Sequence, residues 1–91
     1  MATVTLTVRE DTSGWTCDVR IAAATTTTHH VRVTRTEHER FGHGDVEDLV
    51  RRSVEFLLAR EENTSILSEF SLSTIERYFP EYREVIAAPR S

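Results

Sequence analysis

Four histidines between positions 29 and 43 are the side chains best suited to metal or proton chemistry: His29, His30, His38 and His43. Histidine is the commonest metal ligand and titrates near neutral pH. His29 and His30 are neighbours in an expected strand, where successive side chains point to opposite faces, so they should not share a metal. His38 and His43 are five positions apart across an expected helix end, and no carboxylate completes a known ligand spacing. We therefore predict solvated or hydrogen-bonded histidines and no metal site.

The other reactive residue types also lack a catalytic arrangement. Cys17 is the single cysteine and falls on the apolar face of an expected strand, which is typical of a small buried hydrophobic residue. The three glycines, Gly14, Gly42 and Gly44, do not form a phosphate-binding loop, and no serine lies in a G-x-S-x-G motif. The carboxylates are largely accounted for by helix caps and helix-surface pairs. The sequence thus predicts no catalytic residue, no cofactor and no enzymatic activity.

Aromatic residues of the C-terminal half are the candidates for binding a protein partner. They are Phe56, Phe70, Tyr78, Phe79 and Tyr82. One interpretation is that these rings cover the open end of a small core. The other is an exposed apolar patch for a protein partner, since Tyr and Phe are enriched at interfaces. Tyr78 and Tyr82 are four residues apart, so both hydroxyls could lie at the rim of an interface.

The N-terminal third has the period-two pattern of β-strands. In residues 3–9, Val4, Leu6 and Val8 alternate with Thr and Arg, and residues 15–21 alternate in the same way. Residues 10–14 form a turn cluster, so the two runs predict a hairpin with a longer loop than the tightest types. A third strand is expected over residues 29–33, while the threonine run 25–28 has no sided pattern. The first strand has no Pro, Lys or inward charge to protect an edge.

Helical signals begin after the third expected strand. Thr34-x-x-Glu37 and Thr36-x-x-Glu39 both match a capping box, which predicts a short polar helix ending at Phe41 with Gly42 as its C-cap. Asp45 is an expected N-cap for an amphipathic helix over residues 46–62 that frays at 61–63. A capped turn containing Ile66, Leu67 and Phe70 should follow. Another capping box, Ser73-x-x-Glu76, predicts a helix, and Pro80 either ends it or starts a further turn at Glu81.

Size and charge restrict the class of protein. The 91 residues suffice for one domain, and no apolar run or basic-apolar leader indicates a membrane span or a signal segment. With one cysteine, a reducing cytoplasm is the expected compartment. Residues 1–44 carry five Arg and five acidic residues, while residues 45–91 carry six Arg and ten acidic residues. Because no segment has a clustered basic footprint, nucleic acid is not expected as a partner.

Residues 46–58, VEDLVRRSVEFLL, followed by residues 66–82, ILSEFSLSTIERYFPEY, resemble the C-terminal half of short uncharacterised bacterial proteins. This resemblance extends over residues 46–82 and implies no function, ligand or catalytic residue. A strand followed by two helices is also similar to ribbon-helix-helix regulators. The chain departs from that pattern because a full hairpin comes first, a polar connector precedes the long helix, and no basic strand face is present beyond Arg32 and Arg35.

These patterns together predict a single small α+β domain over residues 1–91, with its sheet in residues 2–35 and its helices in 45–88. We expect a three-stranded, mostly antiparallel sheet (a hairpin plus a third strand), one long amphipathic helix on one face, and short C-terminal helices. The expected buried core is Leu6, Val19, Val33, Leu49, Val50, Val54 and Leu57. The predicted function is that of a small non-enzymatic cytoplasmic protein-interaction or regulatory subunit that binds a protein partner or itself as a homodimer. A DNA-binding regulator of the antitoxin type is the alternative, and a His-based metal enzyme is the third.

Overall fold

Three long strands come first along the chain, and helices and one short strand follow. The computed structural model describes residues 2–41 and 44–87. The elements are β1 (Thr3–Asp11), β2 (Gly14–Ala22), β3 (Thr26–Thr34), α1 (Arg35–Phe41), α2 (Val46–Leu58), a 3-10 turn (Asn63–Ser65), β4 (Glu69–Ser71), α3 (Leu72–Tyr78) and α4 (Tyr82–Ala87). The α+β class is therefore confirmed. The expected C-cap Gly42 and the fourth histidine, His43, lie outside the described residues.

The sheet has four strands in the order β1-β2-β3-β4, so the prediction of three strands is wrong in number. The first three strands are antiparallel neighbours, while β4 runs parallel to β3 with Val31 opposite Phe70. The prediction missed β4 because three residues are too few for an alternating pattern to be recognised. The short strand matters because it carries Phe70 and begins the segment that leads into α3.

The hairpin between β1 and β2 is tighter than predicted. Asp11 pairs with Gly14, so only Thr12 and Ser13 form the loop. The Asp11 Oδ1 atom accepts hydrogen bonds from the backbone N–H groups of Ser13 (2.9 Å) and Gly14 (3.0 Å). Gly14 has a φ of +151°, and a Cβ at this position would lie 2.1 Å from the carbonyl oxygen of Val33. Because glycine has no Cβ, the start of β2 can approach the backbone of β3 this closely.

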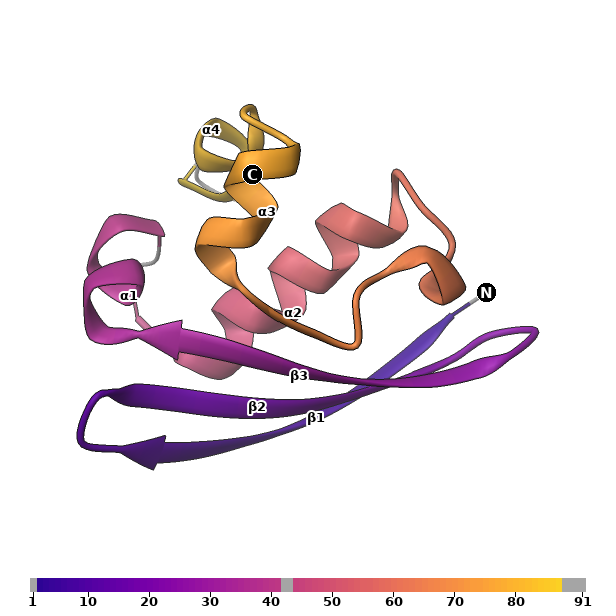
Figure 1. The fold of residues 1–91 in the computed structure, drawn as a ribbon, viewed down its shortest axis with the longest axis horizontal. Coiled ribbons are helices and arrows are strands. Elements are labelled where there is room, and N and C mark those ends of the chain that lie inside the picture. Colours follow the sequence, from indigo (N-terminus) through magenta and orange to yellow (C-terminus); the bar gives the residue numbers. More distant parts are fainter. Residues whose placement is uncertain (1, 42–43, 88–91) are drawn as a thin grey trace.

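The helices lie on one side of the sheet, as Figure 1 shows, and the core fills the space between the two layers. All the core residues predicted from the sequence are buried there: Leu6, Val19, Val33, Leu49, Val50, Val54 and Leu57. The core extends further than predicted because α1, α3 and α4 also contribute large side chains. Phe41, Leu72, Ile75, Tyr82 and Ile86 belong to the same cluster.

Side-chain caps begin the first two helices where the sequence places them. Glu37 donates its backbone N–H to the Thr34 hydroxyl, while Thr34 donates its own to the Glu37 carboxylate, which is the predicted capping box. Asp45 accepts from the backbone N–H of Glu47 at 3.0 Å and is the N-cap of α2. Helix α2 ends at Leu58 rather than Glu62, in keeping with the unfavourable position of carboxylates near a helix C-terminus.

The segment after α2 differs from its prediction. Residues 63–65 form a single 3-10 turn, and Phe70 belongs to β4 rather than to a helical turn. Helix α3 begins at Leu72, with Ser71 as its N-cap and Thr74 in the capping box, so the predicted Ser73 box is wrong by two positions. The reason is tertiary, because Ser73 donates both its backbone N–H and its hydroxyl to the buried carboxylate of Glu37.

Candidate functional site

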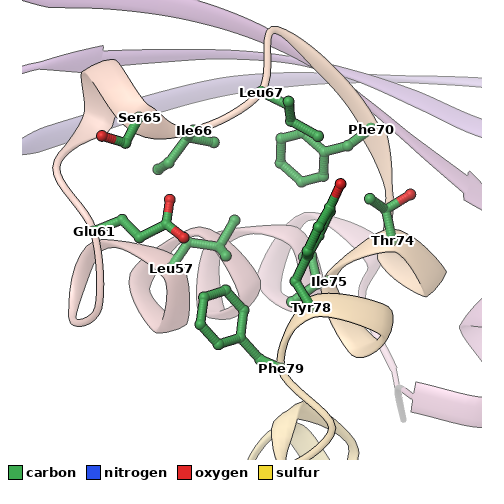
Figure 2. Close-up of a pocket in the computed structure, with 10 residues that line it drawn as sticks. All are labelled: Leu57, Glu61, Ser65, Ile66, Leu67, Phe70, Thr74, Ile75, Tyr78 and Phe79. Atoms are coloured by element: carbon green, nitrogen blue, oxygen red, sulfur yellow. The ribbon is translucent and has the colours of Figure 1, made fainter.

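An apolar groove lies between the C-terminal end of α2, the segment that leads into β4, and α3. Its volume is about 180 Å³. Figure 2 shows the rings of Phe70, Tyr78 and Phe79 around this space, with Glu61 on the opposite side. The lining residues are Leu57, Glu61, Ser65, Ile66, Leu67, Phe70, Thr74, Ile75, Tyr78 and Phe79. We call this feature the apolar groove.

The walls of the apolar groove come from three elements whose positions follow from different interactions. Leu57 is 7 % exposed and faces the core from α2, and Ile75 anchors α3 in the same core. Phe70 is held opposite Val31 by the pairing of β4 with β3. The backbone N–H of His30 also donates to the Ser68 carbonyl at 2.7 Å. The groove is therefore built on a helix, a strand and a second helix that share one core.

A buried polar network holds the loop segment of the apolar groove. His29 is 3 % exposed, and its Nδ1–H donates to the Leu67 carbonyl at 2.7 Å, because a carbonyl oxygen only accepts. The other ring nitrogen, Nε2, lies 2.8 Å from the Thr27 hydroxyl. The Asn63 amide in turn donates to the hydroxyl of Thr27 and to the carbonyl of Thr25. With Nδ1–H donating to Leu67, Nε2 can accept from the Thr27 hydroxyl, so each hydrogen bond of this network has a donor and an acceptor.

The five aromatic residues proposed for partner binding divide into two groups. Phe56 and Tyr82 are 5 % and 0 % exposed and belong to the core, so they offer no contact surface. Their rings pack edge to face, with centroids 5.2 Å apart. The Tyr82 hydroxyl lies 2.7 Å from the hydroxyl of Ser53, and burial raises the pKa of Tyr82. The predicted aromatic surface is thereby reduced to Phe70, Tyr78 and Phe79.

Those three aromatic residues line the apolar groove to different depths. Phe79 is half-buried and packs against Phe56, with ring centroids 5.8 Å apart, so it joins the groove to the core. Phe70 is also half-buried, whereas Tyr78 is 66 % exposed. Leu67, which is 50 % exposed, lies beside them. Tyr78 and Leu67 are the large apolar side chains of the groove that a partner could reach directly.

The sequence prediction missed the aliphatic part of the groove. Ile66 and Leu67 were assigned to a helical turn, and Leu57 to the core alone. A signal for Ile66 and Leu67 did exist, since two adjacent large apolar residues on a non-helical segment cannot both face one core. It could not be used without knowledge that the segment is extended.

Charge around the groove is negative at the α2 end. Glu61 lines the groove, and within the described ranges its carboxylate forms no hydrogen bond or ion pair. Glu62 follows it and is exposed. Arg60 turns away from the groove, because its guanidinium stacks 3.6 Å from the centroid of the Phe56 ring and lies 3.6 Å from the Glu81 carboxylate. A side chain entering the groove therefore meets an uncompensated carboxylate at one end.

The three histidines that the structure describes are separated in the fold. His29 belongs to the buried network, His30 lies 2.7 Å from an oxygen of Asp18 on the opposite face of the sheet, and His38 lies against the Trp15 ring. Within residues 2–41 and 44–87, no three His, Cys, Asp or Glu side chains gather closely enough to hold a metal ion.

Cys17 lies in the core with 0 % exposure, as the strand pattern predicts. Burial raises the pKa of its thiol to about 11, and the nearby charges of Asp18 and Glu47 act in the same direction. The thiol is therefore protonated and enclosed at neutral pH. Reactive cysteines have the opposite character, namely a lowered pKa and access to solvent.

Comparison with known proteins adds no assignment, because no protein-family model, curated protein or solved structure matches this chain. In the part of the chain that the structure describes, no helix is both long and apolar enough to span a membrane.

Proposed function

We propose that this protein is a small non-enzymatic interaction subunit whose apolar groove receives a large apolar side chain from a protein partner. The observation that carries the proposal is the pair Leu67 and Tyr78, which stand 50 % and 66 % exposed at a groove with an apolar lining. Exposed apolar groups that gather at a concave site are typical of a binding surface. Single exposed apolar residues elsewhere need no such explanation.

The size of the groove favours a side chain over a small-molecule ligand. Its volume of about 180 Å³ is smaller than the ~300–1,000 Å³ typical of pockets that enclose drug-sized ligands. Interface hot spots, in contrast, are single aromatic or large apolar side chains that fill local pockets. The ionisable groups that line the groove are Glu61 and Tyr78, and they offer no nucleophile with an adjacent base.

The charge of the groove favours a basic residue next to the apolar one. Glu61 has no ion-pair partner among the described residues, and the C-terminal end of α2 adds the negative end of the helix dipole. Residues 45–91 also carry four more acidic than basic residues, ten against six. The expected occupant is therefore a segment in which a Leu, Phe or Met lies beside an Arg or Lys.

Selection from a random peptide library displayed on phage tests this proposal. The immobilised full-length protein should enrich peptides that carry a bulky apolar residue next to a basic residue. Tyr78→Ser should weaken binding of an enriched peptide about tenfold or more, as loss of an interface anchor does. Glu61→Gln should weaken it by up to about fivefold, mainly at low salt, because the lost ion pair is at the rim.

Val85→Ser is the matched control for Tyr78→Ser. Val85 is 47 % exposed on α4 and does not line the groove, so its replacement should leave peptide affinity unchanged. Circular dichroism of each variant checks that the fold is retained. Failure to enrich any common peptide pattern, or equal binding by the Tyr78→Ser variant and the unchanged protein, would overturn the proposal.

A further inference from the structure

The sheet has one long unpaired edge, which belongs to β1. Strand β1 spans nine residues and pairs with β2 without interruption from Thr3 to Asp11, so no bulge twists it away. The opposite edge is the three-residue strand β4, which leads directly into α3. Figure 1 shows β1 along the outer margin of the sheet, on the side away from β4.

The hydrogen-bonding groups on this edge belong to Val4, Leu6, Val8 and Glu10. The backbone N–H of His30 donates toward β4, so His30 and the opposite Asp18 form a non-hydrogen-bonded pair. Because alternate residues bond to alternate neighbours, Asp18 bonds to Thr7 on its other side. The even-numbered residues of β1 therefore direct their N–H and C=O groups outward.

A contact from α2 agrees with this assignment. Arg51 reaches the edge of the sheet, and its Nη1 donates to the Val4 carbonyl at 2.9 Å. A carbonyl oxygen has two acceptor sites, so this bond leaves room for a second donor. The inward side chains of the edge are Val4, Leu6 and Val8, and the strand contains neither Pro nor Lys. Most of the devices that natural proteins use to protect an exposed edge are thus missing from β1.

We propose that the β1 edge pairs with β1 of a second copy, antiparallel and with the twofold axis at Leu6. In this register Leu6 lies opposite Leu6 of the second copy, and Val4 lies opposite Val8. Each of these pairs joins residues whose N–H and C=O groups point outward, as a hydrogen-bonded pair requires. A twofold axis makes the same patch serve both copies.

The neighbouring registers fit less well. An axis at Thr7 would place the Glu10 side chain opposite Val4, which exposes an apolar residue to a carboxylate. An axis at Thr5 would leave Val8 opposite Ala2, which lies outside the strand. The Leu6 register alone among these pairs all three apolar edge residues with one another. It also places Arg9 opposite Thr3, so no like charges face each other.

The partner surface gains apolar contact as well as backbone bonds. Val4 and Val8 are only half-buried in one copy, and both pack against the core. Pairing would cover their exposed sides and extend the four-stranded sheet of each copy into one continuous sheet. None of the residues that line the apolar groove belongs to β1, so the groove stays open in the dimer.

Sedimentation over a concentration series tests the association. The protein should approach about 21 kDa, twice the 10.4 kDa of one chain. Thr5 and Thr7 are exposed and face each other across the proposed axis. The dimer of the double variant Thr5→Asp/Thr7→Asp should therefore have a dissociation constant raised about tenfold or more, because like charges lie directly opposite each other.

Thr26→Asp/Thr28→Asp is the matched control, since it adds the same charge at exposed positions of β3 away from the edge. It should leave the dimer unchanged. Peptide binding by the apolar groove should persist in the Thr5→Asp/Thr7→Asp variant, which separates this proposal from the proposed function. A 10.4 kDa species at every concentration, or an equal effect of both double variants, would overturn edge pairing.

Cysteine cross-linking tests the register. In the Leu6 register, Thr5 of one copy lies opposite Thr7 of the other, with Cα atoms about 4.5 Å apart, which a disulfide can join. Mild oxidation of a mixture of Thr5→Cys and Thr7→Cys proteins should give a disulfide between the two variants. Cys17 should not react, because it is fully buried. A disulfide formed readily by Thr5→Cys alone or by Thr7→Cys alone would overturn the Leu6 axis.

Discussion

Glu37 is a buried carboxylate that joins two helices distant in the sequence. One of its oxygens accepts from the backbone N–H of Thr34 (2.9 Å), and the other accepts from the backbone N–H (2.8 Å) and hydroxyl of Ser73. Burial by itself would raise the pKa of Glu37, but the hydrogen bonds from Ser73 and Thr34 outweigh it, and the pKa is lowered. The charged form is therefore the one that stabilises the fold.

Replacing Glu37 with Gln should destabilise the protein by about 1–3 kcal/mol at pH 7, since bonds to a charged acceptor are lost. Because the folded-state pKa lies below its ordinary value of 4.5, the contribution is present above that pH. It is lost as the pH falls through the folded-state pKa. The difference between wild type and Glu37→Gln should thus shrink in acid, as measured by urea unfolding between pH 7 and pH 3.

Glu39→Gln is the control, because Glu39 lies on the same helix and is exposed. Its unfolding free energy should stay within about 0.5 kcal/mol of wild type at each pH, as for most surface substitutions. If the Glu37→Gln and wild-type curves run parallel into acid, the carboxylate does not carry the proposed pH dependence.

At the scale of elements, the β1–β2 hairpin depends on one glycine. Gly14 combines a φ of +151° with a close approach to the backbone of β3, where an added Cβ would meet the Val33 carbonyl oxygen. Gly14→Ala should therefore cost more than the about 1–3 kcal/mol typical of a strained φ alone. Thermal or urea unfolding measures this loss.

Gly44→Ala separates strain from collision. Gly44 also has a positive φ, +100°, but nothing lies within 4 Å of its added Cβ. Its replacement should cost no more than the strained φ, so the excess cost of Gly14→Ala measures the clash with β3. Equal losses for the two variants would mean that the close approach of the strands is not limiting.

Helix α2 packs on the sheet through its apolar stripe, and Leu57 tests that face. Leu57→Ala should cost about 2–3 kcal/mol, in the low part of the range for buried leucines, because the site borders the apolar groove and stays open to solvent. Leu58→Ala, at a half-buried neighbouring position, should cost less. Chemical denaturation compares them, and an unchanged midpoint for Leu57→Ala would contradict the assigned face.

At the scale of the whole molecule, the basic residues are largely neutralised by carboxylates. Arginines that form ion pairs in the described chain are Arg9, Arg32, Arg35, Arg40, Arg52, Arg60 and Arg83. Arg32 and Arg35, the residues on which a DNA-binding alternative depends, are held by Asp11 and Glu10 at the hairpin end. The Arg32 guanidinium donates hydrogen bonds to the Asp11 carboxylate, and this is the main reason that the pKa of Asp11 is lowered.

This protein should not bind DNA through general electrostatics. Its formal net charge is −4, and seven arginines of the described residues pair with carboxylates. The described part of the chain therefore offers no clustered basic surface that would release counterions from DNA. Fluorescence anisotropy of a labelled random duplex at 20 mM salt should stay constant up to high protein concentration. Tight binding that weakens steeply with added salt would contradict this expectation.

The sequence by itself determined the elements whose signals are local. Alternating residues predicted all three long strands, and Asp45 predicted the start of α2. Two overlapping Thr-x-x-Glu boxes predicted the start of α1 to within two positions, and the one at Thr34 is the one that forms. The seven predicted core residues are buried as expected, because the apolar faces of strands and helices leave water by packing against one another. The predicted burial of Cys17 on the apolar face of its strand is also confirmed.

Tertiary structure alone decided the rest. Strand β4 forms because it pairs with the free edge of β3. Three residues are too few to show an alternating pattern, so the sequence does not predict this strand. Ser73 lies inside α3 rather than at its N-cap, and its backbone N–H and hydroxyl donate to Glu37, thirty-six positions away. Phe56 and Tyr82 became core residues while Phe70, Tyr78 and Phe79 came to line the apolar groove. Both groups contain Phe and Tyr from the same half of the chain. Ring type therefore does not distinguish them, and the packing of α3 and α4 against α2 separates buried aromatic residues from accessible ones.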